Sequence, residues 1–345
     1  MTFFLLNAQK NPLYVSIQPQ YGYVLKHSAR LNYLNTTTPY GVELSAAWHL
    51  ISDSIYNTYG LNPKVGSYIS VINFNHETLG ITIPVGIFVE PFFKYGKKIT
   101  TKLKAGVGIA YTSKPYDSIT NPLNVAYSLK ITGHAFIGIG FNYNISEKYT
   151  VGLISSWHHF SNGAIKEPNK GINIPSVIFN FDYCINPAKN LSREKLTEQY
   201  KKHTRYELVI FEAKKTDAHL EKKFDIYGVW VNYSRQVSRI NAVTLGSEFI
   251  VNTFIREYIN RIPEATGDHK RINVLIGHEF IIGKVIFSQN IGIYVYCPYD
   301  AMDPVYQRYG LSYHFKNGII IGTNLKAHRH VGDFIDFRLG YSFVK

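Results

Sequence analysis

The chain has 345 residues, of which 45% are apolar and 15% aromatic, and it carries a formal net charge of +13 at pH 7. This composition excludes a disordered chain, and no apolar run approaches the roughly 18–20 residues of a membrane helix, which excludes a helical membrane protein. The positive charge favours an anionic partner, and because runs of Lys and Arg are only two residues long, a phosphorylated lipid surface is favoured and we expect no nucleic-acid binding.

The first segment, residues 1–9 (MTFFLLNAQ), contains an apolar stretch and a small residue, Ala8. It lacks the positive start and the full length of a signal peptide. It is consistent with the remnant of such a peptide, cleaved after Ala8, or with a frayed first segment.

Apolar and polar residues alternate along most of the remaining chain. In residues 135–145 (AFIGIGFNYNI), one face carries Ile137, Ile139, Phe141 and Tyr143, whereas the other carries Gly138, Gly140, Asn142 and Asn144. Residues 99–111 and 335–343 show the same pattern. Segments of about ten residues with an apolar face and aromatic ends are typical of outer-membrane barrels. We therefore predict an all-β fold, an antiparallel outer-membrane β-barrel with about 16 strands.

The connections between the predicted strands alternate in length. Short turns are expected at residues 95–98, 146–148, 237–239, 283–284 and 316–318. Long loops are expected near residues 112–134, 161–174, 213–224, 253–271, 297–307 and 327–333. Outer-membrane barrels keep short turns in the periplasm and long loops outside. The carboxyl terminus is therefore expected in the periplasm.

One connection breaks this alternation. Residues 186–204 are charged, with few apolar positions, where a short periplasmic turn is due. We expect a solvated linker or helix there, separating two strand-rich halves at residues 10–185 and 205–345. Two arrangements remain open: one wide barrel, or an eight-stranded barrel followed by a second half.

A histidine and a serine end the predicted strand 149–162, which runs into a loop rich in Gly, Asn and Pro. His159 and Ser161 share a face with Leu153, which makes it the lipid face, and Asn173 lies on the corresponding face of the next strand. Polar groups that face lipid are costly. They are therefore either catalytic or simply solvated above the hydrocarbon.

The run HFSN (159–162), followed by PNKG (168–171), resembles the active-site segment of the PagL family of lipid A 3-O-deacylases. Residues 22–34 (GYVLKHSARLNYL) are similar to longer, acyloxyacyl-hydrolase-type relatives. By position, the resemblance implies Ser161 as the nucleophile and His159 as the general base. The implied oxyanion-hole candidates are Asn169, Asn162 and Gly163. The barrel resemblance covers residues 10–185 and gives no mechanistic support to 205–345.

The third member of the site departs from the family. The family has a glutamate after the Pro-Asn-x-Gly run, whereas this chain has Asn173. Replacing the acid by its amide in a serine-protease triad costs about 10⁴ in kcat, although Cys-His-Asn enzymes do use an asparagine. Glu167, in the same loop, is an alternative acid.

The resemblance implies an outer-membrane serine esterase that removes an ester-linked acyl chain from lipid A. Its active-site end would face the outer leaflet, and no cofactor is expected. Candidate ligands for lipid A phosphates on the predicted outer loops are Lys166, Lys170 and Arg329. The alternative function is a non-enzymatic barrel, either a channel or a component of a surface or secretion assembly, with a degenerate site. No protein partner is indicated.

No residue cluster has the spacing of a metal site. His158 alternates to the opposite face from His159, so we expect it to be a polar residue of the barrel interior rather than a metal ligand. The sequence also lacks the G-x-S-x-G and H-E-x-x-H motifs.

Overall fold

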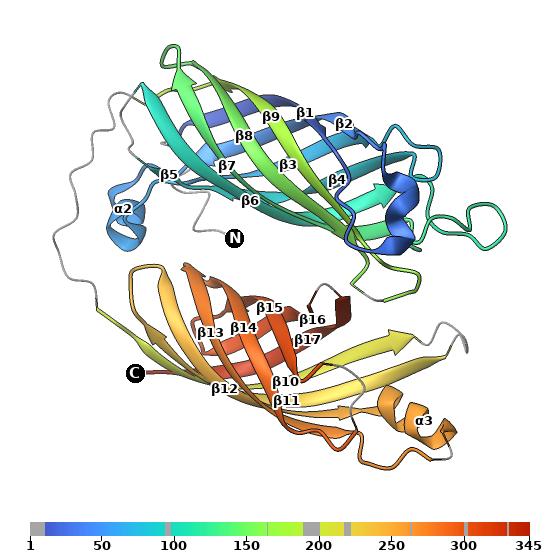
Figure 1. Ribbon diagram of the computed structural model, residues 1–345. Coiled ribbons are helices and arrows are strands. Elements are labelled where there is room, and N and C mark those ends of the chain that lie inside the picture. The colour runs from blue at the N-terminus through green and yellow to red at the C-terminus, as the bar shows by residue number, and fades with distance from the viewer. Residues whose placement is uncertain are drawn as a thin grey trace. The chain divides into compact units, whose positions relative to one another are not determined.

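The computed structural model describes residues 11–93, 98–163, 165–188, 201–216, 222–262, 264–299, 303–329 and 331–345. Within these ranges the chain divides into two compact units, each built on a closed antiparallel barrel of eight strands (Figure 1). This confirms the predicted fold class and, of the two arrangements left open, excludes the single wide barrel. The segment predicted to be a signal-peptide remnant (residues 1–9), most of the predicted linker and most of the predicted turn at 95–98 lie outside the described residues.

The first barrel is formed by eight strands that pair in chain order and close through β9 on β1 and β4 on β6. The strands are β1 (Leu13–Gly22), β2 (Tyr40–His49), β3 (Lys64–Asn73), β4 (Ile81–Glu90), β6 (Ile99–Thr112), β7 (Ile131–Asn144), β8 (Tyr149–Ser161) and β9 (Ile172–Cys184). A two-residue strand, β5 (Phe92–Phe93), adds a short pairing to β6. Two short helices lie in the connections: η2 (Ala29–Leu34) and α2 (Asp53–Tyr59).

The second barrel closes through β17 on β10. Its strands are β10 (Thr204–Thr216), β11 (Lys223–Gln236), β12 (Asn241–Asn252), β13 (Lys270–Ile282), β14 (Val285–Tyr296), β15 (Val305–His314), β16 (Ile319–His328) and β17 (Val331–Val344). One helix, α3 (Thr253–Arg261), follows β12. Among the described residues, no helix is long and apolar enough to cross a membrane.

Both barrels are apolar outside and polar inside. On β7 the side chains of Ile137 and Ile139 are 59% and 64% exposed, whereas Asn142 of the same strand is buried. On β17, Phe337 is 74% exposed and Asp336 is fully buried. This inversion of the usual pattern of a soluble protein requires an apolar solvent around each barrel. The two-faced alternation in the sequence therefore predicted the faces correctly.

The interior of the first barrel is filled by paired charges. Three buried ion pairs line it: Lys104–Glu43 (2.6 Å), Lys64–Asp182 (2.9 Å) and Lys102–Glu90 (3.1 Å). Eight strands leave an interior just wide enough for side chains. These pairs therefore act as the polar core that holds the barrel wall together.

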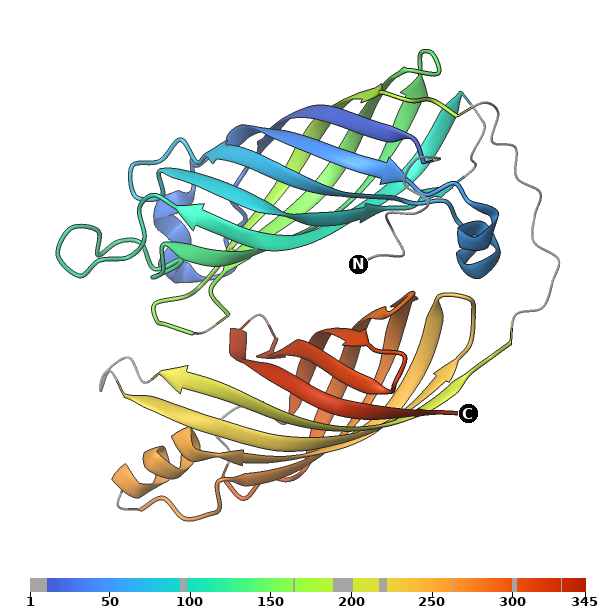
Figure 2. The same cartoon turned by 180° about the vertical axis from the view of Figure 1, so that it is seen from behind.

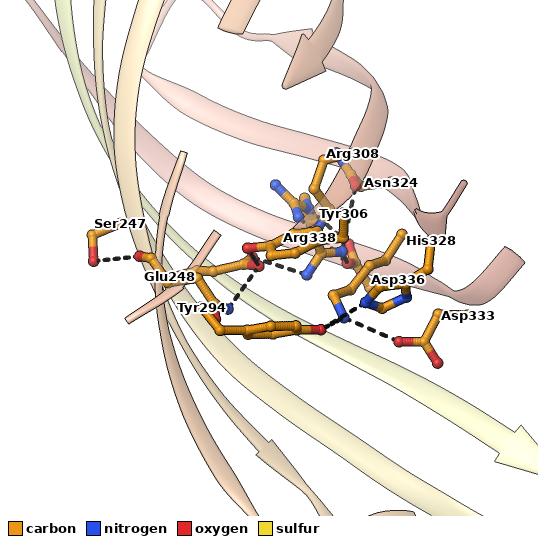
Figure 3. Close-up of polar contacts among 12 residues, drawn as sticks. Ser247, Glu248, Tyr294, Tyr306, Arg308, Asn324, His328, Asp333, Asp336 and Arg338 are labelled. Carbon is orange, nitrogen blue, oxygen red and sulfur yellow. Dashed lines mark hydrogen bonds and ion pairs between the residues drawn. The ribbon is translucent and has the colours of Figure 1, made fainter. Parts of the chain in front are cut away.

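The interior of the second barrel holds a comparable network (Figure 3). Arg308 is fully buried and donates hydrogen bonds to Glu248, at 2.9 Å, and to Asp336. Tyr306 donates to the other oxygen of Glu248 at 2.6 Å. Every charge in this group has an opposite charge in contact, which buried ions require.

Loops and short helices mark the two ends of the first barrel. Figures 1 and 2 show, from opposite sides, α2 at one end and the long loop 113–130 at the other. Because neighbouring strands are antiparallel, the connections β1–β2, β3–β4, β6–β7 and β8–β9 share the end opposite α2. A buried apolar cluster lies beneath these four connections: Val24, Leu31, Leu34, Ile72, Phe74, Leu79, Ala110, Ala126, Tyr127, Phe160, Ile172 and Ile174. It gives the loops of this end a rigid base.

One predicted loop length is wrong. A long connection was expected at 327–333, but β16 ends at His328 and β17 begins at Val331. The ladder continues to the pair His328↔Val331, with a register shift at Lys326/Ala327. Arg329 adopts φ +53°, the left-handed conformation that this tight turn requires.

Candidate active site

His159 and Asn173 form a cross-strand pair where β8 and β9 meet the loop that connects them, at the end of the barrel opposite α2. They are direct partners in the antiparallel ladder, and His159 Nδ1 lies 2.8 Å from Asn173 Oδ1. The neighbouring residues Phe160 and Ile172 point inward, into the apolar cluster. The strand register and this cluster together fix where both polar side chains lie.

Ser161 forms a second pair with Asn169 of the β8–β9 loop. Asn169 Nδ2 donates to Ser161 Oγ at 3.0 Å, and Asn169 Oδ1 accepts from the backbone N–H of Asn162 at 3.0 Å. The backbone N–H can only donate, so it fixes which end of the amide faces the serine. An N–H donor therefore lies beside the serine oxygen.

Two further side chains contact Asn173. Trp157 Nε1 donates to Asn173 Oδ1 at 3.3 Å. Asn173 Nδ2 lies 3.1 Å from His27 Nδ1, and His27 Nε2 lies 2.7 Å from the carbonyl oxygen of Lys170. His27 comes from the β1–β2 connection, 146 positions earlier in the chain, so no local spacing in the sequence could indicate this contact.

Glycine shapes the loop that carries Asn169. Gly163 and Gly171 both have φ in the left-handed region, +64° and +69°. A Cβ atom on Gly171 would lie 3.0 Å from His159 Cε1, so the loop backbone packs directly against the imidazole. The backbone N–H groups of Lys170 and Gly171 donate to the loop 113–130, at Val125 and Ala126. The loop is therefore held in place at Lys170 and Gly171.

The other residues predicted for the site lie in different surroundings. Asn162 is buried and its side chain donates to Ser128 Oγ at 3.2 Å, while its backbone N–H is used by Asn169. Glu167 and Lys166 are exposed loop residues; His159 Nδ1 is bonded to Asn173 rather than to Glu167. Lys170 is half-buried and contributes its carbonyl oxygen.

Arg329 belongs to the second barrel. Its side chain is 75% exposed and pairs with Asp303 at 3.0 Å.

His158 points into the interior, as predicted. It is buried and contacts Ser156 Oγ at 2.9 Å and His134 Nε2 at 3.1 Å. Within the described part of the chain, no group of three or more His, Cys, Asp or Glu side chains could hold a metal ion.

The arrangement provides the parts of a serine nucleophile site. It places a serine and a histidine on one strand face, a third residue hydrogen-bonded to Nδ1 of that histidine, and an amide donor beside the serine. A weakly nucleophilic hydroxyl requires such a base, and the base requires an orienting partner. The site lies at the loop end of the barrel and on its outer face.

Two family models match the chain, one for each barrel. The model described as Lipid A 3-O-deacylase (PagL) matches residues 22–182, which contain the whole site. The model described as Acyloxyacyl hydrolase, C-terminal domain, matches residues 204–345. These matches confirm the resemblance seen in the sequence and extend it to the second barrel. A comparison with curated proteins finds no match.

Several solved structures are similar to this chain. The crystal structure of the outer membrane enzyme PagL is 17% identical, with a TM-score of 0.36, and the match covers 48% of this chain and 97% of that one. Neisserial surface protein A is 10% identical, with a TM-score of 0.35 and coverage of 50% and 96%. A mutant of the Rh. blastica porin is 13% identical, with a TM-score of 0.21 and coverage of 96% and 99%.

Proposed function

Because the chain belongs to the PagL family of lipid A 3-O-deacylases, we propose that it is an outer-membrane serine esterase that removes an ester-linked acyl chain from lipid A. The observation that supports this most is the joint geometry of the two hydrogen-bonded pairs, His159–Asn173 and Ser161–Asn169, on one face of the barrel. We place this end of the first barrel at the outer leaflet, where lipid A phosphates could pair with the exposed Lys166 and with Lys170.

In the proposed reaction, Ser161 Oγ attacks the ester carbonyl and passes its proton to His159 Nε2. The oxyanion of the tetrahedral intermediate accepts a hydrogen bond from Asn169 Nδ2, which in the resting state is 3.0 Å from Ser161 Oγ. His159 then gives the proton to the departing alkoxide. Water attacks the acyl-enzyme by the same route, releases the fatty acid and restores the serine.

The proposal is tested by mass spectrometry of lipid A incubated with the full chain in detergent. The wild type should remove one acyl chain, and Ser161→Ala and His159→Ala should each lose nearly all activity, because members of such a unit act together. Ser155→Ala is the matched control, since Ser155 is exposed on the same face of β8. It should keep the wild-type rate.

The competing function is a barrel without enzymatic activity, in which Asn173 marks a degenerate site. It is favoured if the folded wild type removes no acyl chain, hydrolyses no p-nitrophenyl ester, and gains no activity from Asn173→Glu. A Ser161→Ala variant as active as the wild type would also overturn the esterase proposal.

A further inference from the structure

The hydrogen bonds around Asn173 connect a series of groups. The group at one end of the series can only accept a hydrogen bond, and the group at the other end can only donate one. At one end, Lys170 O can only accept, and it lies 2.7 Å from His27 Nε2. At the other end, the indole N–H of Trp157 can only donate, and it lies 3.3 Å from Asn173 Oδ1. Every group between these ends must take the role that its neighbours leave to it.

Only one assignment of donors and acceptors is compatible with both Lys170 O and the indole N–H of Trp157. His27 Nε2 must carry a proton to donate to Lys170 O, and His27 Nδ1 must then be the acceptor for Asn173 Nδ2, at 3.1 Å. This turns Asn173 Oδ1 toward Trp157 and His159. His159 Nδ1, 2.8 Å from that oxygen, must carry the proton. The lone pair of His159 is therefore left on Nε2, the nitrogen that a base for Ser161 needs.

We propose that His27 is a positioning residue of this site, which sets the amide of Asn173 and through it the tautomer of His159. The inference rests on the proposed function, because it concerns the base of that same site. It explains how an amide can stand where the family has a carboxylate. A carboxylate accepts with either oxygen, whereas an asparagine supports the base in only one of its two orientations.

The reverse orientation of Asn173 would disable the base. Its Nδ2 would then face His159 Nδ1, which would have to accept, and the ring proton would move to Nε2. A histidine with Nε2 protonated cannot take the proton of Ser161. This is the wrong-tautomer state that lowers kcat by about 10⁴ in a serine-protease triad. His27 and Trp157 both oppose it.

Two substitutions of His27 separate positioning from packing. His27→Phe keeps a planar ring but removes the acceptor, whereas His27→Asn places an amide oxygen near the position of Nδ1. We expect His27→Phe to lower kcat for p-nitrophenyl ester hydrolysis by about 10- to 100-fold, the range found when the orienting partner of a metal-bound histidine is lost, with KM nearly unchanged. His27→Asn should recover most of the rate.

The decisive comparison measures the effect of His27→Phe both in the wild type and in the Asn173→Glu variant. A carboxylate at 173 needs no orientation, so His27→Phe should change kcat much less in Asn173→Glu than in the wild type. A loss of the same size in both backgrounds would overturn the inference and leave His27 with a packing role. Wild-type kcat in His27→Phe would also overturn it.

A spectroscopic measurement makes the test independent of catalysis. In folded protein with 15N-labelled histidine, His159 should show a protonated Nδ1 and a bare Nε2, and its signals are identified by their loss in His159→Gln. His27→Phe should shift this ring toward the other tautomer. An unchanged ring would contradict the inference even in an active enzyme. An inactive wild type with the expected tautomer change would instead reject the proposed function and keep the positioning role.

Discussion

His159 of β8 and Asn173 of β9 face each other across one pair of the antiparallel ladder, with Nδ1 and Oδ1 2.8 Å apart. Directly opposite residues are the closest side-chain neighbours that a sheet offers. The third position of the site is therefore fixed by strand register rather than by a flexible loop. A substitution at 173 changes the partner of His159 without moving the histidine.

Asn173 is accordingly the most informative position to change. Asn173→Ala should lower kcat while leaving the barrel folded, because His159 loses its hydrogen-bond partner. Asn173→Glu supplies an acceptor-only group that fixes the tautomer and stabilises the imidazolium, so it should raise kcat by at most about 10⁴. Ester hydrolysis rates and circular dichroism of the two variants check this.

The result that would contradict a role for Asn173 is equally clear. If both substitutions leave a measurable wild-type rate unchanged, Asn173 takes no part in the reaction. Glu167, exposed in the same loop, is then the acid to replace. In that case Glu167→Gln should lower kcat.

Gly171 supplies a second test of how the base is held. Gly171→Ala puts a side chain at φ +69°, which costs about 1–2 kcal/mol, and places its Cβ 3.0 Å from His159 Cε1. Displacement of a reacting group by about 1 Å can cost 10²-fold, so we expect kcat to fall by up to that factor. Gly60→Ala is the control, because Gly60 has φ +71° at the end of α2. It should lose stability without losing activity.

Much of the fold could be predicted from the sequence because a barrel wall has a two-residue period. The alternation that exposes Ile137 and Ile139 and buries Asn142 is visible in the sequence itself. The number of barrels could not be predicted from the sequence, because the closure of a barrel depends on which strands pair at the edges of the sheet. The pairings β1–β9 and β10–β17 join residues far apart in sequence, and no local pattern encodes them.

The candidate site could be predicted from the sequence only for the residues that lie on one pair of neighbouring strands. His159, Ser161 and Asn173 lie on two adjacent strands, and a period of two places them on the same face. His27 and its contact with Asn173 depend on the β1–β2 connection crossing to β9, where Leu25 pairs with Asn173. The two-residue turn at Arg329 was missed because strand ends depend on pairing rather than on composition.

Asn169 tests the oxyanion assignment. Asn169→Ala removes the amide donor beside Ser161 Oγ and should lower kcat by about 10²–10³, the usual cost of one oxyanion-hole donor. Asn169→Asp keeps the shape and an acceptor for the backbone N–H of Asn162 but puts negative charge near the developing oxyanion. It should be at least as slow as Asn169→Ala. Single-turnover acylation of the full chain with a p-nitrophenyl ester measures this step, and an Asn169→Asp variant faster than Asn169→Ala would contradict the assignment.

Arg308 tests whether paired charges hold the second barrel together. Arg308→Met leaves Glu248 and Asp336 buried without their shared cation (Figure 3). Breaking a buried pair by removing one partner costs about 3–5 kcal/mol, so the free energy of unfolding should fall by that amount. Lys214→Met is the matched control, since Lys214 pairs with Asp225 at 2.7 Å but is 60% exposed. We expect it to change stability little.

The measurement follows unfolding of the full chain in detergent by urea. The ring centre of Trp230 lies 4.2 Å from the guanidinium carbon of Arg338, so Trp230 fluorescence reports on the interior of the second barrel. Its signal is isolated by replacing Trp48 and Trp157 with Phe in every sample.

A second substitution tests whether the loss of stability comes from the uncompensated charge. In Arg308→Met, adding Glu248→Gln removes the carboxylate that is left without a cation, whereas Asp336 keeps its ion pair with Arg338 at 2.6 Å, so this variant should recover part of the lost stability. If Arg308→Met and Lys214→Met destabilise the barrel equally, the buried network is not what holds it, and packing of the surrounding aromatic side chains must account for its stability.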